Sequence, residues 1–146
     1  MNAVSSDPQF ENDSRDAFSF IASASPLATL YACYHPDSFG NAIIALEGDR
    51  MRVKVVRDRR QFLVDLAPVA SGDWFDISVV LDLIGAGATA RELEAAEWRA
   101  LGPIADAVRE HAGAICARFQ PAAWPATRAS LRALQEARAK QLFDHG

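Results

Sequence analysis

Alternating hydrophobic and polar positions run through the middle of the chain in three successive segments. Apolar residues occupy every second position over residues 41–47, 50–57 and 60–67. A period of two is typical of β-strands that bury one face and expose the other. Only short polar stretches separate the segments, so we predict a three-stranded antiparallel meander with its aliphatic side chains gathered on one face.

The two connections of this meander predict a register. Gly48 and Asp49 fit a two-residue type II′ turn, because glycine readily adopts the positive φ that this turn requires at its first position. Such a loop pairs Ile44 with Val53, and a second loop at Asp58 and Arg59 pairs Val53 with Val64. Both hairpins place the same aliphatic residues on one face, whereas a slip of one residue would turn them all over.

Helical spacing precedes the meander. Residues 1–12 are polar and acidic, and we expect them to form a disordered lead. From residue 13 onward apolar residues recur with the period of a helix, which we expect to resume after Pro26 over residues 27–34. The chain is then one domain over residues 13–146.

A mainly helical half follows the meander, over about residues 89–143. Thr89 and Glu92 fit a capping box at its start. Apolar residues spaced by three and four over 98–119 predict one long helix, kinked at Gly102 and Pro103.

Two shorter signals complete the helical prediction. Asp76 is a candidate N-cap for a short helix over 77–84, and Gly85 suits its C-terminal end. Pro125 suits the first turn of a last helix that reaches about residue 143, forming a C-terminal helical hairpin with the helix before it. The predicted class is therefore α+β, with the meander packed against helices.

Composition fits one globular domain. The chain has 146 residues, of which 50% are hydrophobic and 23% are charged. Its apolar runs are far shorter than the roughly 20 residues that a membrane-spanning helix needs. The start of the chain lacks the basic and apolar regions of a signal peptide, and two cysteines make no disulfide framework, so we expect a cytoplasmic protein.

Basic residues are concentrated in one part of the meander. Residues 50–60 contain six of the fifteen Lys and Arg residues and one acid, although the whole chain has a net charge of −4. Such a segment could contact nucleic acid phosphates. The pattern supplies no exposed aromatic residues for base stacking and the chain is acidic overall, which argues against nucleic acid.

The polar face of the meander also carries apolar residues. Ile43, Ala45 and Leu63 fall among charged positions, and an apolar centre rimmed by charge is typical of a protein interface. Trp74 and Phe75 lie between two acids, which predicts either a contact patch or a hydrophobic staple at a helix start. The candidate contact residues are Arg52, Lys54, Arg57, Arg59, Trp74 and Asp76.

Motifs for catalysis, metals and cofactors are missing from the sequence. It contains no Gly-x-Ser-x-Gly nucleophile motif, and Gly85 and Gly87 lack the third glycine of a dinucleotide loop. Cys33 with His35 and His111 with Cys116 supply too few ligands for a zinc site. We therefore predict no catalytic residues, no metal and no cofactor.

Three short segments suggest a family. Residues 39–41, 55–61 and 73–76 resemble small uncharacterised bacterial proteins, some of which look like the immunity proteins of toxin–immunity systems. The resemblance covers about residues 39–85 and implies a cytoplasmic binding protein without catalysis. The expected partner is another protein or a second copy of the chain. The alternative is a small anionic-ligand-binding protein or enzyme with a site between sheet and helices, where arginines hold the anion.

Overall fold

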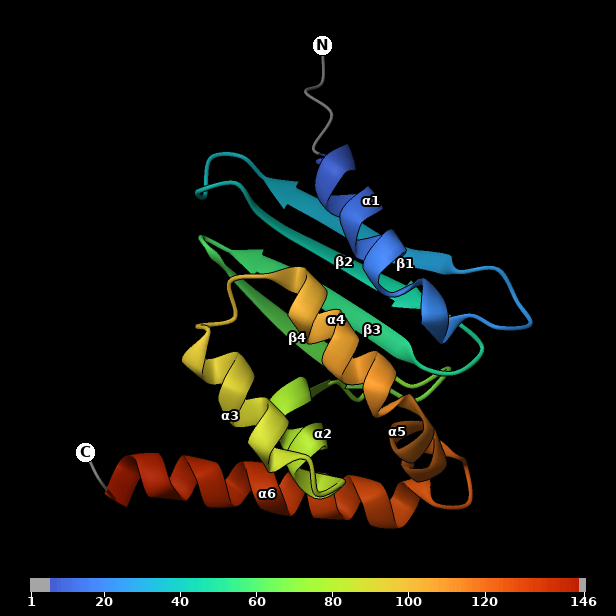
Figure 1. Cartoon of the computed structure of the whole chain (residues 1–146), viewed down its shortest axis with the longest axis vertical. Helices are drawn as coiled ribbons and strands as arrows, with labels where there is room; N and C mark the ends of the chain where they lie inside the picture. Colours follow the sequence, from blue (N-terminus) through green and yellow to red (C-terminus); the bar gives the residue numbers. More distant parts are fainter. Residues whose placement is uncertain (1–5, 145–146) are drawn as a thin grey trace.

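The computed structural model describes residues 6–144 (Figure 1). An N-terminal helix and a 3-10 turn lead into the sheet, and the other helices follow it. The elements are α1 (Pro8–Ala17), η1 (Ser19–Ile21), β1 (Ala28–His35), β2 (Asn41–Glu47), β3 (Arg52–Asp58), β4 (Gln61–Ala67), β5 (Phe75–Asp76), α2 (Ile77–Leu83), α3 (Gly87–Ala95), α4 (Leu101–Glu110), α5 (Ala112–Phe119) and α6 (Trp124–Asp144).

The sheet of the described residues has five antiparallel strands in the order β1-β2-β3-β4-β5. The α+β class is confirmed. Strands β2, β3 and β4 occupy the three segments that the alternating pattern marks, and β1 and β5 extend the sheet on either side. Figure 1 shows α1 and α4 lying across one face of this sheet.

The predicted register is wrong by two residues, although the predicted inner face is right. Ile44 pairs with Val55 and Val53 pairs with Leu66. The turns are displaced accordingly: the first spans residues 48–51 and the second is formed by residues 59 and 60. A shift of two preserves the side-chain alternation, so these aliphatic side chains all lie in the core, at most 1% exposed.

Gly48 is required for a different reason from the predicted one. It does not have a positive φ. A Cβ atom at this position would lie 2.1 Å from the carbonyl oxygen of Ile21, which also accepts a hydrogen bond of 3.0 Å from the Arg50 amide. The turn therefore needs glycine because the backbone of η1 packs directly on it.

The N-terminal third corrects two predictions. Residues 27–34, expected to be helical, form most of strand β1, which pairs with β2 through residues such as Cys33 and Ile43. Thr, Tyr and Cys side chains favour extended backbone there. Helix α1 begins at Pro8, inside the expected lead over 1–12, because the Asp7 side chain caps it by accepting from the Phe10 amide. Residues 1–5 of that lead lie outside the described residues.

The helical half after the sheet is present, but its boundaries differ from those expected. Helix α3 begins at Gly87, so Thr89 lies inside it and caps nothing. Glu97 and Trp98, both with positive φ, separate α3 from α4, and His111 separates α4 from α5. The prediction of one long kinked helix over 98–119 is therefore wrong. Pro103 lies in the first turn of α4, where a missing amide costs no hydrogen bond.

One hydrophobic core joins the sheet to the helices. Phe18, Ile104 and Leu131 are fully buried in it. At the far side Trp124, in the first turn of α6, meets Phe119 of α5 and Phe75 of β5 in edge-to-face contacts with ring centroids 5.5 and 6.0 Å apart. These contacts hold the last helix against the end of the sheet.

We predict that Gly48→Ala destabilises the fold. The added methyl group meets backbone atoms of Ile21 that cannot move without displacing η1, so the free energy of unfolding should fall by about 1–3 kcal/mol. Urea unfolding followed by circular dichroism measures it. Gly72→Ala is the matched control, because a Cβ at Gly72 meets nothing within 4 Å. Equal stabilities for the two variants would contradict the close approach.

A pH dependence follows from Asp49, whose carboxylate accepts hydrogen bonds from the Ser23 and Ala24 amides at 2.6 and 2.9 Å. These bonds lower its pKa from 3.8 to about 2. Its ionised form therefore stabilises the fold fully above the unfolded pKa, and this contribution is lost as the pH falls through the folded pKa. The gap in urea midpoint between wild type and Asp49→Asn should be constant near neutral pH and shrink toward about pH 2. A gap that stays constant throughout would contradict this assignment.

Candidate binding surface

The face of the sheet that turns away from the core, here called the outer face, carries an apolar row. Cys33, Ile43, Val56 and Leu63 are directly opposed across β1, β2, β3 and β4. Leu63 is 43% exposed, Cys33 is exposed, and the two central residues are half-buried. The helices of the described residues therefore leave this row accessible to solvent.

A second row, beside the first, is polar and aromatic. It runs from Tyr31, which is 47% exposed, through Ala45 to Lys54 and Asp65. Ala45 is fully buried, so it does not contribute to an exposed apolar centre as predicted. The Lys54 ammonium lies 3.3 Å from the Asp65 carboxylate and 5.1 Å from the centre of the Trp74 ring. This side chain therefore combines an ion pair with a cation–π contact on the open face.

The carboxyl group of Asp65, in this row, is partly buried and lies near both a positive and a negative charge. Burial raises the pKa of its carboxyl group. The Lys54 ammonium opposes this effect and the nearby Asp76 carboxylate reinforces it. Asp76 is the Cα partner of Asp65 across β4 and β5, so two acids sit side by side at this end of the row.

Arg52 holds the loop that follows β4. It forms an ion pair with Glu47, its partner across β2 and β3, and donates a hydrogen bond of 2.7 Å to the Ser71 carbonyl. Glu47 in turn accepts from the Ala70 amide at 3.2 Å. The Arg52 hydrogen bond lowers the pKa of Glu47, and the pair fixes the loop after β4 to the rim of the outer face.

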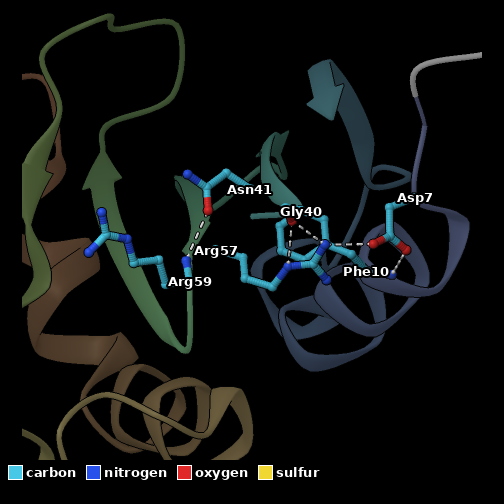
Figure 2. A network of polar contacts seen from close by, with 6 residues as sticks. All are labelled: Asp7, Phe10, Gly40, Asn41, Arg57 and Arg59. Atoms are coloured by element: carbon cyan, nitrogen blue, oxygen red, sulfur yellow. Dashed lines mark hydrogen bonds and ion pairs between the residues drawn. The ribbon is translucent and has the colours of Figure 1, made fainter. Parts of the chain in front are cut away.

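Arg57 lies on the other side of the sheet from Arg52 and Lys54. Figure 2 shows its guanidinium between α1 and the β1–β2 connection. It donates to the Gly40 carbonyl at 2.6 and 3.1 Å, pairs with the Asp7 carboxylate at 2.6 Å and stacks 5.0 Å from the Phe10 ring. The arginine bond is the main cause that lowers the pKa of Asp7. Arg57 therefore anchors α1 to the sheet.

Arg59 lies in the turn between β3 and β4, with a positive φ of 60°. Its amide donates to the Asn41 side chain at 2.9 Å, and its guanidinium lies 5.0 Å from the centre of the Phe39 ring. Figure 2 shows this side chain pointing away from Arg57. The Phe39 side chain is 77% exposed. Because Arg59 lies in a turn and contacts this exposed ring, it belongs to the end of the sheet rather than to the outer face.

The segment around β5 divides its residues between the two faces. Phe75 is buried against Trp124, whereas Trp74 covers Lys54 on the outer side. Asp76 caps α2, because its carboxylate accepts from the amide of Ser78 at 2.7 Å and from the hydroxyl of the same residue at 2.5 Å. The predicted cap at Asp76 is confirmed. Of the two aromatic residues before it, Phe75 belongs to the core and Trp74 to the outer face.

A hollow of about 250 Å³ lies between β4, α2, α3 and α6. Arg138 of α6 crosses it and donates to the Ser78 hydroxyl at 2.7 Å and to the Asp82 carboxylate at 3.2 Å. The other charged groups of the lining are Asp76, Glu94 and Arg91. Three carboxylates against two guanidinium groups do not favour an anion in this hollow, where the alternative hypothesis would place one.

Residues 6–144 contain no group of three or more His, Cys, Asp or Glu side chains placed to hold a metal ion. Cys33 and Cys116 are both free thiols, and burial raises the pKa of Cys116. Over the same residues, none of the helices has the length and apolarity to span a membrane.

Comparisons with models of protein families, with curated protein sequences and with solved structures find no match for this chain. Of the six predicted contact residues, Arg52, Lys54 and Trp74 lie together at the outer face, with Asp76 at its β5 end. Arg57 and Arg59 do not join them.

The sequence prediction missed part of the apolar and aromatic rows. Tyr31 and Cys33 were predicted to lie in a helix, so neither was expected on a face of the sheet. The signal that could have indicated a strand there is the preference of Thr29, Tyr31 and Tyr34 for extended backbone, not an alternation of polar and apolar residues.

The role of Arg57 can be tested by stability. Arg57→Met removes charge-assisted hydrogen bonds that join α1, β3 and the β1–β2 connection, so the free energy of unfolding should fall by about 1.5–3 kcal/mol. Arg59→Met, at the exposed turn, should change it by less than about 0.5 kcal/mol. Urea unfolding of both variants gives the comparison. A larger loss for the Arg59 variant would contradict the anchoring role of Arg57.

Proposed function

We propose that this protein is a non-catalytic protein-binding module that contacts its partner with the outer face of the sheet. The observation that carries this proposal is the apolar row of Cys33, Ile43, Val56 and Leu63, which crosses four strands with its two ends exposed and its centre half-buried. In an antiparallel sheet with one face on the core, the other face is normally polar. A continuous apolar row there supports a role in contact with another protein.

The neighbouring groups have the composition of an interface. Tyr31, Lys54 and Trp74 flank the apolar row, and aromatic residues contribute most of the binding energy in many interfaces. Arg52 and Glu47 neutralise each other at the rim, as Lys54 and Asp65 do nearer the centre. Because the face carries paired charges, we expect a partner recognised mainly by shape and apolar contact, not by long-range charge attraction.

The resemblance of residues 39–85 to immunity proteins is compatible with this proposal. An immunity protein acts by covering a toxin surface, which needs a rigid contact face and no catalytic residues. The loop after β4, held by Arg52, and the cap at Asp76 keep the rim of such a face in place. A cytoplasmic protein that occludes one partner is therefore the form of the proposal that we favour.

Coexpression with the products of neighbouring reading frames tests the proposal. A partner should copurify in stoichiometric amount with the wild-type chain, and Leu63→Asp should reduce its affinity at least tenfold by placing a charge in the apolar row. Leu142→Asp is the matched control, because Leu142 is a leucine that is 78% exposed but lies on α6 rather than on the sheet. Isothermal titration calorimetry measures both affinities.

Hydrogen exchange of the complex locates the contact. We expect protection of β2, β3 and β4 with little change in α3 and α6. Protection confined to the helices, an unchanged affinity for Leu63→Asp, or no copurifying partner would each count against the outer face as the binding surface.

A further inference from the structure

The sheet has one open edge in the described part of the chain. On the β4 side, β5 pairs with Asp65 and Leu66, and the Phe62 amide donates to the Trp98 carbonyl at 2.8 Å. On the other side β1 is the outermost strand, and seven of its eight residues are exposed. An edge strand presents a row of backbone donors and acceptors that another strand can pair with.

The first part of β1 is protected against such pairing. The strand has a register shift between Thr29 and Tyr31, which leaves Leu30 outside the regular ladder. Arg15 of α1 also donates to the Leu27 carbonyl at 2.9 Å and to the Thr29 hydroxyl. A bulge and a covering charged side chain are both common ways to block an edge.

The remaining part, residues 31–35, carries no such protection. It pairs regularly with β2 and contains no Lys, Arg, Asp, Glu or Pro, the residues that commonly prevent edge pairing. The neighbouring helix leaves it open as well, since α1 packs on β2 and α4. The open edge therefore coincides with the part of the strand that pairs regularly with β2.

We propose that residues 31–35 pair antiparallel with the same residues of a second copy, joining two sheets into one of ten strands. A two-fold axis perpendicular to the sheet keeps each outer face on the same side, so directly opposed residues must have the same parity. The register with the longest overlap is centred on Cys33, which then faces its own copy. Tyr31 faces His35 and Ala32 faces Tyr34, so no like-charged side chains meet.

The chemistry of the outer face favours a second copy over an unrelated strand. Cys33 is also the β1 member of the apolar row. Pairing centred on it sets the apolar rows of the two copies end to end, from Leu63 of one copy to Leu63 of the other. This inference goes beyond the proposed function and does not depend on it, because the edge can pair whether or not a partner covers the face.

The test uses charge at the two-fold position. Sedimentation velocity of the wild type should show a dimer that dissociates on dilution. Cys33→Lys places two ammonium groups face to face across the axis, so it should be monomeric while keeping the wild-type circular dichroism spectrum. Leu63→Lys is the matched control: it adds the same charge to the same face, but on β4, and should remain dimeric.

Crosslinking supplies an independent readout of the register. In the Cys116→Ala variant Cys33 is the sole thiol, and a short bismaleimide should convert the dimer into one covalent species. A strict monomer at the highest soluble concentration, a dimer that survives Cys33→Lys, or a dimer lost in Leu63→Lys but kept in Cys33→Lys would overturn the proposal. The last result would indicate that two copies stack through their outer faces.

Discussion

The burial of one aliphatic face of the sheet is the constraint on which the rest of this structure depends. Ile44, Val53, Val55 and Leu66 are completely buried beneath the helices. Burying each such side chain stabilises the fold by about 1.5–3 kcal/mol. Because side chains alternate along a strand, this burial also assigns every other residue of β2, β3 and β4 to the outer face. The position of the candidate surface is therefore a consequence of the core.

The same alternation explains what sequence can and cannot predict here. A shift of two residues leaves every side chain on its original face, so the pattern defines the inner face without defining the register. The register depends on η1, whose Ile21 carbonyl contacts the Gly48 turn from far away in sequence. Strand β1 was missed for a related reason: residues exposed on both sides have no one-sided apolar period to detect.

The same alternation separates the predicted contact residues into two groups on opposite faces of the sheet. Arg52 and Lys54 share the parity of the outer face, whereas Arg57 shares the parity of the buried residues Val53 and Val55, and the alternation alone could have placed it inside. A charge is tolerated there because Asp7, the N-cap of α1, forms an ion pair with it at the end of the strand. No sequence pattern indicated that contact, or the two-residue strand that brings Trp74 over Lys54.

The open face and the open edge have a common origin, since helices packed on one side of a sheet cover neither. Both surfaces include Cys33, so binding of a partner to the outer face can change the free energy of dimerisation. A partner that lies across the two-fold axis contacts the apolar rows of both copies and therefore stabilises the dimer as it binds. A partner that covers only the region around Leu63 contacts one copy and leaves the monomer–dimer equilibrium unchanged. The dependence of dimerisation on the partner thus distinguishes a binding surface made by one sheet from one made by two.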